Sequence, residues 1–204
     1  MKGLLKKLFG RGELPTVVVV SGLPRSGTSM MMKMLEAGGI PPLTDKQRTA
    51  DADNPKGYYE FERVKQLDKG DSDWLPQAEG KAVKIISALL KHLPPTYHYK
   101  VIFMERHMPE ILASQHKMLV RRQEEADKVD DEQMAALFQK HVSETKKWLA
   151  AQPNFELLSI HYSDVLQDGW PQIQAVNQFL SGHLDEKAMA NVVDPDLYRN
   201  RQPD

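Results

Sequence analysis

Cysteine is absent from the 204-residue chain, so no disulfide and no thiolate-rich metal site can form. The absence suits a reducing compartment, and we expect a cytoplasmic protein. No apolar run approaches the length of a membrane-spanning helix. The formal net charge is only −1, so no global field attracts nucleic acid, and any anion-binding site has to be local. The acidic residues show no spacing that predicts a metal site.

The length suits a single domain over residues 1–204 with one substantial core. Residues 1–14 form a basic amphipathic segment, in which lysines interrupt the leucines, so the continuous apolar core of a signal peptide is missing. Such a segment can lie on a membrane surface. Docking of its apolar side on the domain is the favoured interpretation, and membrane contact is the alternative.

The most informative stretch of the chain is residues 16–29. Four consecutive valines, Val17–Val20, are typical of a strand that is buried on both faces of a parallel sheet. A tight loop with two glycines follows, and then a helix begins. Unpaired backbone N–H groups and the helix dipole favour negative charge at such a place, which predicts a phosphate-binding loop. Its candidate binding residues are Pro24, Arg25, Ser26, Gly27, Thr28 and Ser29.

The details of this loop narrow the choice of ligand. Gly22 and Gly27 have the spacing of a nucleoside-triphosphate loop, but Thr28 stands where that loop has its lysine. Arg25 is the only cation within the loop. The pattern therefore argues against a P-loop kinase, and a plain strand-to-helix turn is the structural alternative.

Further apolar segments alternate between strand and helix patterns. This alternation predicts an α/β fold, in which a three-layer parallel sheet of about four or five strands is flanked by helices. A capping-box spacing begins at Asp130, and His141 falls on the apolar side of the helix that follows, as a core histidine would. The expected strands span residues 81–87, 99–104 and 155–162, and the expected helices include 30–35, 89–93 and 169–180, one that begins near Pro109 and one that Asp185 caps.

A second candidate anion anchor lies at the end of the third strand. Arg106 ends that strand, and Ser114 follows eight residues later in the next helix. Arginine offers a planar, permanently charged fork for phosphate oxygens, and serine adds a neutral donor. The alternative is that Arg106 pairs with a nearby acid while Ser114 faces solvent.

The chain resembles the sulfotransferase superfamily, and within it the bacterial-type sulfotransferases. The resemblance rests on the sequence Pro-Arg-Ser-Gly-Thr-Ser after a valine strand and on the Arg106/Ser114 pair. The resemblance implies a P-loop-like fold and the donor 3′-phosphoadenosine 5′-phosphosulfate (PAPS), which leaves as 3′-phosphoadenosine 5′-phosphate (PAP). The loop would hold the 5′-phosphosulfate, and Arg106 and Ser114 the 3′-phosphate. Arg199 lies in a C-terminal segment that resembles the basic segment closing over this phosphate.

The resemblance also implies a reaction, in which a sulfuryl group moves to a hydroxyl or amine of a small-molecule or carbohydrate acceptor. No metal is expected, because Arg25 and the loop amides supply positive charge, with Arg25 as an electrostatic clamp. In the carbohydrate branch a glutamate after the first helix is the base, which points to Glu60 and next to Glu62; neighbouring aromatic residues can raise the pKa of such a carboxyl. The further candidates are His92 and His107.

Two other functions remain open at the level of sequence. A catalytically silent member would bind nucleotide or a partner protein without a working base. A P-loop kinase fits less well, because the loop lysine is missing and the third strand ends in Glu105 and Arg106 rather than in a magnesium-binding aspartate. The acceptor itself is not indicated by any motif.

Overall fold

The computed structural model describes residues 14–45, 59–122 and 130–193. Nearly all of the basic amphipathic segment at residues 1–14 lies outside these ranges, and so does Arg199. The predictions made for these two parts of the chain therefore stay predictions.

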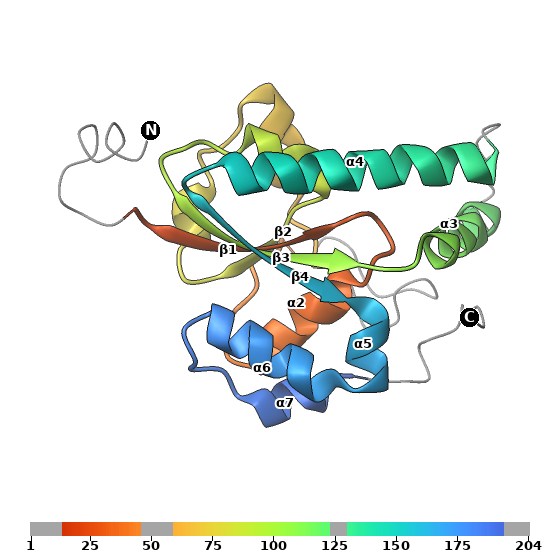
Figure 1. Ribbon diagram of the computed structural model, residues 1–204. Coiled ribbons are helices and arrows are strands. Elements are labelled where there is room, and N and C mark those ends of the chain that lie inside the picture. Colours follow the sequence, from red (N-terminus) through yellow and green to blue (C-terminus); the bar gives the residue numbers. More distant parts are fainter. Residues whose placement is uncertain (1–13, 46–58, 123–129, 194–204) are drawn as a thin grey trace.

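Four parallel strands form the central sheet, as the alternation predicts (Figure 1). They are β1 (Thr16–Gly22), β2 (Ala82–Lys84), β3 (His98–Glu105) and β4 (Phe155–His161). Their order across the sheet is β2-β1-β3-β4, and Val19 of β1 lies between Val83 of β2 and Val101 of β3. The valine strand is thus a central strand, with a partner on each side.

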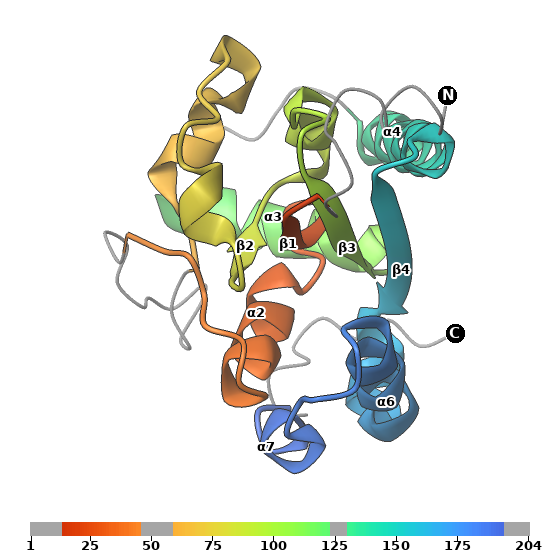
Figure 2. The ribbon, with the colours of Figure 1, turned by 90° about the vertical axis from the view of Figure 1, so that its left-hand side faces the viewer.

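Helices cover both faces of the sheet, which gives the predicted three layers (Figures 1 and 2). One face carries α4 (Asp131–Ala151) and the 3₁₀ helices η1 (Glu62–Lys69), η2 (Leu75–Ala78) and η3 (Ser87–His92). The other face carries α2 (Thr28–Ala37), α6 (Gly169–Phe179) and α7 (Glu186–Ala190). Two further helices, α3 (Met108–Arg122) and α5 (Tyr162–Gln167), follow the carboxyl ends of β3 and β4.

The core explains why β1 is apolar on both sides. Val17 and Val19 pack into the cluster under α4 and the 3₁₀ helices, whereas Val20 packs into the cluster over α2 and α6. In α2 the side chains of Met31, Met32 and Met34 are fully buried in this second cluster. The methionines of α2 therefore serve as core.

The edges of the predicted elements differ from the structure in several places. The second strand is shorter than residues 81–87, because the chain turns into η3 at Ser87, and η3 replaces the helix expected at 89–93. The fourth strand ends at His161, so Tyr162 begins α5 instead of ending the strand. Asp130 does precede α4, but its side chain makes no cap hydrogen bond. Asp185 caps α7 as expected, through a hydrogen bond from the Ala188 amide.

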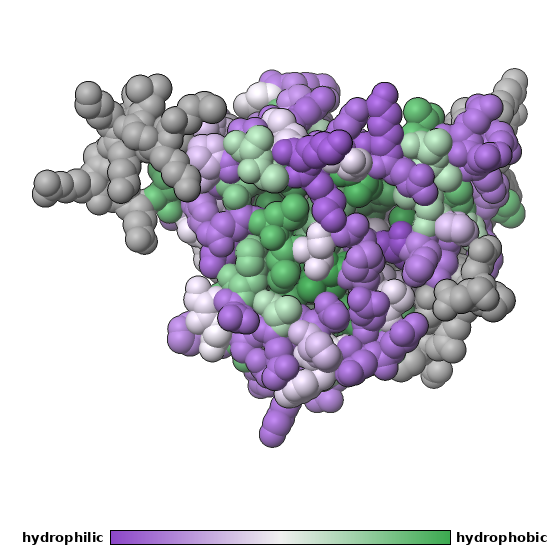
Figure 3. All heavy atoms as spheres, in the orientation of Figure 1, coloured by the Kyte–Doolittle hydropathy of each residue, from purple (hydrophilic) through white to green (hydrophobic). Residues whose placement is uncertain are grey.

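The edge of the sheet formed by β4 is only partly covered by other elements. β4 is an edge strand, and most of its residues are only partly buried. Figure 3 shows apolar residues gathered on this face of the molecule, between α4 and α6.

Among the residues that the structure describes, no helix is long and apolar enough to cross a membrane. The cytoplasmic location stays a prediction.

The strand order creates a switch point beside β1. The chain leaves β1 toward β2 on one side, and β3 then pairs on the other side of β1. In open parallel sheets, ligands bind outside the carboxyl ends of the strands at such a point. The loop after β1 and the residue after β3 both lie there, so the fold brings the two predicted anion anchors to one edge.

The core cluster under α4 gives a test of this packing. Trp74 is fully buried, its ring lies edge-on to Phe61 at 5.6 Å, and its Nε1 donates to the Asp71 carbonyl at 3.1 Å. We expect Trp74→Ala to lower the free energy of unfolding by about 3–5 kcal/mol, because it removes a large core side chain. Urea denaturation measures this change. Trp170→Ala is the control, with 43% of Trp170 exposed, and should cost about 1 kcal/mol or less.

Candidate active site

The loop between β1 and α2 has a backbone that requires its glycines. Gly22 and Gly27 have φ angles of 146° and 100°, which side chains rarely tolerate. A Cβ at Gly22 would lie 2.5 Å from the Met104 carbonyl oxygen, and one at Gly27 would lie 2.5 Å from the Tyr162 ring. The two glycines therefore let the loop lie directly against the end of β3 and against α5.

Gly27 is also the N-cap residue of α2, and the Met31 amide donates to its carbonyl at 3.2 Å. Thr28 and Ser29 are the first two residues of the helix, as predicted. The amides at a helix start have no partner within the helix, and the dipole adds partial positive charge. The loop thus has the geometry of an anion site, with Pro24 exposed on its outer side.

Arg25 connects the loop to the second anchor. It has a φ angle of 70°, which is rare for a residue other than glycine. Its Nε donates to the Ser114 hydroxyl at 2.9 Å, and its carbonyl accepts from Nη1 of Arg106 at 3.2 Å. The structure therefore brings Arg25, Arg106 and Ser114 together across 81 and 89 residues of sequence.

Arg106 is held in a buried ion pair. Its Nε donates to Glu110 at 2.8 Å, and the two side chains are only 8% and 3% exposed. The guanidinium also lies over the Tyr162 ring, 4.5 Å from the ring centre. The alternative drawn from the sequence for this pair of residues is correct for Arg106, which does pair with a nearby acid. It is wrong for Ser114, which is buried and does not face solvent.

Glu60 lies next to a lysine at the end of β2. Its carboxylate is 3.6 Å from Nζ of Lys84, with 23% of the Glu60 side chain and 12% of the Lys84 side chain exposed. Two bonds hold the segment around Glu60: the Thr44 hydroxyl donates to its carbonyl at 2.8 Å, and the Tyr59 hydroxyl donates to Glu36 of α2 at 2.6 Å. Burial, and then this hydrogen bond, raise the pKa of Tyr59. Glu60 is therefore a partly buried carboxylate at the carboxyl edge of the sheet.

The other candidate bases lie in less suitable places. Glu62 begins η1 and pairs with Lys65 at 2.7 Å in an exposed salt bridge. His92 and His107 are exposed at the end of η3 and just after β3. His141 accepts or donates a hydrogen bond with the Ser87 hydroxyl at 2.8 Å, consistent with a satisfied histidine between α4 and η3.

The sequence analysis did not identify three residues that lie at the carboxyl edge of the sheet. Glu110 follows Arg106 at the i, i+4 spacing of a helical ion pair, which is a signal that the sequence did contain. Lys84 is the last residue of β2, at the sheet edge where ligands bind in such folds, and the sequence could have predicted this position as well. Tyr162 was assigned to the strand instead of the following helix, so its place beside Gly27 and Arg106 became visible only in the structure.

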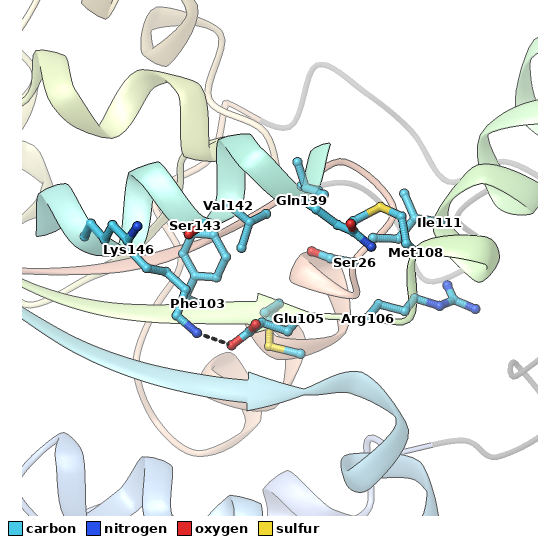
Figure 4. A pocket seen from close by; sticks show the side chains of 13 residues that line it. Ser26, Phe103, Glu105, Arg106, Met108, Ile111, Gln139, Val142, Ser143 and Lys146 are labelled. Atoms are coloured by element: carbon cyan, nitrogen blue, oxygen red, sulfur yellow. Dashed lines mark hydrogen bonds and ion pairs between the residues drawn. The ribbon is translucent and has the colours of Figure 1, made fainter. Parts of the chain in front are cut away.

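A pocket of about 530 Å³ opens beside the loop, between α4, the start of α3 and the end of β3 (Figure 4). Glu105 and Lys146 form an ion pair at 2.7 Å in its wall. Burial alone would raise the pKa of Glu105, but hydrogen bonds from Lys146 and Ser159 and the charges of Lys146 and His161 lower it. Ser26 also lines the pocket, and its side chain is turned inward instead of outward to the loop surface.

The described residues contain no cluster of three or more histidine, aspartate or glutamate side chains suited to a metal ion. At the end of β1 and in the loop after it, the hydroxyls of Ser21 and Ser26 are buried and have no hydrogen-bond partner within the described part of the chain. Both hydroxyls lie at the carboxyl edge of the sheet, beside the loop predicted to bind an anion.

Comparison with solved structures agrees with this architecture. The chain is similar to the sulfotransferase domain of the Synechococcus PCC 7002 olefin synthase, with 14% identity, a TM-score of 0.54, and coverage of 94% of this chain and 86% of that one. It is also similar to retinol dehydratase in complex with androsterone and inactive cofactor PAP, with 16% identity, a TM-score of 0.51, and coverage of 93% and 67%. At these identities the likeness shows the fold.

Family membership rests on the sequence. No curated protein sequence matches the chain. The family model described as "Sulfotransferase domain", however, matches residues 15–195, from the residue before β1 to two residues beyond the last one that the structure describes. This match covers most of the chain and includes the loop, Arg106 and Ser114. The chain therefore belongs to the sulfotransferase domain family.

Proposed function

We propose that the protein is a PAPS-dependent sulfotransferase that moves the sulfuryl group to a hydroxyl or amine of a small-molecule or carbohydrate acceptor. One observation carries the proposal: Arg25 of the loop bonds to Ser114, and Arg106 bonds to the Arg25 carbonyl. Both predicted phosphate anchors thus occupy one edge of the sheet, as a nucleotide with phosphates at its 3′ and 5′ ends requires. The solved complexes of retinol dehydratase with PAP support this choice of nucleotide.

The donor site would use the charges of both anchors. The loop amides and Arg25 would hold the 5′-phosphosulfate, and Arg106 and Ser114 the 3′-phosphate. Glu110 balances the charge of Arg106 in the free protein, so the buried guanidinium is held in place before a ligand arrives. Preorganisation of this kind reduces the ordering cost of binding. We also propose that the whole chain forms a single domain around this site.

The chemistry would need charge stabilisation and a base. Negative charge develops on the bridging oxygen of the donor, and Arg25 can stabilise it without losing its own proton. Glu60 is the candidate base, because it is a partly buried carboxylate at the carboxyl edge of the sheet, 3.6 Å from the Lys84 ammonium. A catalytically silent nucleotide-binding protein is the alternative, and it differs in having no working base.

Nucleotide choice is the first test of the proposal. We expect calorimetry to find much tighter binding of PAP than of ADP, because ADP lacks the 3′-phosphate. Arg106→Ala alone would leave Glu110 as a buried, unpaired charge and destabilise the fold. The matched pair is therefore Glu110→Gln against Arg106→Met/Glu110→Gln, and the added loss of Arg106 should cost roughly 1.5–3 kcal/mol in PAP affinity. Equal affinities of the wild type for PAP and ADP would refute the donor assignment.

The role of Arg25 is the second test. Arg25→Ala should lower kcat more than it raises KM for PAPS, because the charge that Arg25 stabilises grows during transfer. Arg25→Lys should keep part of the activity, since a cation remains while the planar fork is lost. Steady-state kinetics with PAPS as the varied substrate separate the two constants. An unchanged kcat in the alanine variant would exclude this role.

The base is the third test. Glu60→Gln should bind PAP normally but transfer sulfate about 10²-fold or more slowly, the usual loss when a general base is removed. The acidic limb of the pH–rate profile should disappear as well. Glu62→Gln is the control, because Glu62 lies two residues away in an exposed pair with Lys65. Full activity in both variants would move the base elsewhere, with His92 and His107 next in turn.

A further inference from the structure

The pocket beside the loop has a mostly apolar wall. At about 530 Å³ it falls within the roughly 300–1,000 Å³ that small-molecule sites occupy. Strand β3 supplies Phe103 to one side, and α4 supplies Val142 to the other. The start of α3 closes a third side. The apolar residues of the wall are Leu23, Phe103, Met104, Met108, Ile111 and Val142.

A buried hydroxyl marks one point of this wall. Ser26 is 1% exposed, and its Oγ has no hydrogen-bond partner within the described residues. Leaving a buried polar group unsatisfied costs about 1–3 kcal/mol, so a hydroxyl with no partner in a pocket wall favours a ligand that supplies one. Ser26 belongs to the loop where the sulfuryl group would sit. A ligand hydroxyl bonded to Ser26 would therefore lie next to the donor.

One end of the pocket is cationic. Figure 4 shows Lys146 and its ion pair with Glu105 toward one end, Met108 and Ile111 toward the other, and Ser26 between them. Lys147 is the next residue on α4 and also lines the pocket. No acidic side chain pairs with Lys147 in the part of the chain that the structure covers, so this end carries one positive charge more than Glu105 balances. Glu105 is the counter-ion of Lys146 in this ion pair.

We propose that this pocket binds the acceptor, and that the acceptor is a small hydroxy acid with an apolar body. Its hydroxyl lies at Ser26, its body lies against Phe103 and Val142, and its carboxylate lies near Lys146 and Lys147. The proposal rests on the proposed function. On transfer, the hydroxyl oxygen bonds to sulfur, the bond from sulfur to the bridging oxygen breaks, PAP leaves with that electron pair, and the proton of the hydroxyl goes to Glu60, the base of the proposed function.

The place of binding is tested with two fluorescent probes, 6-hydroxy-2-naphthoic acid and 2-naphthol, titrated with and without PAP. Ser143→Trp puts a bulky ring into the pocket from an exposed position of α4, so folding is not at issue. It should weaken binding of the hydroxy acid by about tenfold or more and leave PAP affinity unchanged. The matched control is Glu144→Trp, an exposed residue of the same helix outside the pocket. Unchanged hydroxy-acid affinity in Ser143→Trp, or a loss of PAP affinity, would overturn the proposal.

The charge preference is tested with the same probes. The wild type should bind the hydroxy acid about fivefold more tightly than 2-naphthol, the effect of one additional charge pair in water. Lys147→Gln should remove this preference, whereas Lys140→Gln, exposed on the same helix outside the pocket, should keep it. Equal affinities of the wild type for both probes would exclude an acid. A wild type that fails to bind PAP would instead refute the proposed function, and the titrations without PAP would still decide the pocket.

Discussion

The bonded group Glu110–Arg106–Arg25–Ser114 is the interaction on which the site depends. It ties the loop after β1 to the helix after β3, and it holds Arg25 in a backbone conformation that a non-glycine residue rarely adopts. The ion pair at its base is almost fully buried, so neither partner can be lost without leaving the other as a costly buried charge. The shape of the loop and the position of the second anchor are therefore one structural feature.

The parallel sheet gives this group its setting. Because β1 is central, the loop after it has the end of β3 on one side and the end of β2 on the other. Arg106 follows the first of these strands, and Lys84 with its partner Glu60 ends the second. The proposed donor anchors and the candidate base thus reach the same edge from different parts of the chain, and α4 closes the pocket proposed for the acceptor.

The two faces of the sheet differ in the polarity of the residues at the carboxyl ends of the strands. On the side of α2, the methionines and aliphatic residues form an apolar core that holds α2 in place directly after the loop. On the side of α4, polar residues come at the carboxyl end of the strands: Ser21, Ser87 and Glu105. The first of these has no partner within the described residues, and the other two pair with side chains of α4. A helix that is linked to the sheet end through polar contacts, with a pocket beneath it, is suited to accept a ligand.

The sequence by itself determined the fold class, the valine strand, and the glycine loop that follows it, and it predicted Arg106 and Ser114 as a pair, because short-range patterns encode these features. A β-branched run, a glycine spacing and an eight-residue interval need no knowledge of distant neighbours. Only the tertiary structure decided that Ser114 contacts Arg25, that Glu60 lies beside Lys84, and that Tyr162 lies under Arg106. These contacts join residues 24 to 89 positions apart, so they depend on the order of strands in the sheet, which no local pattern contains.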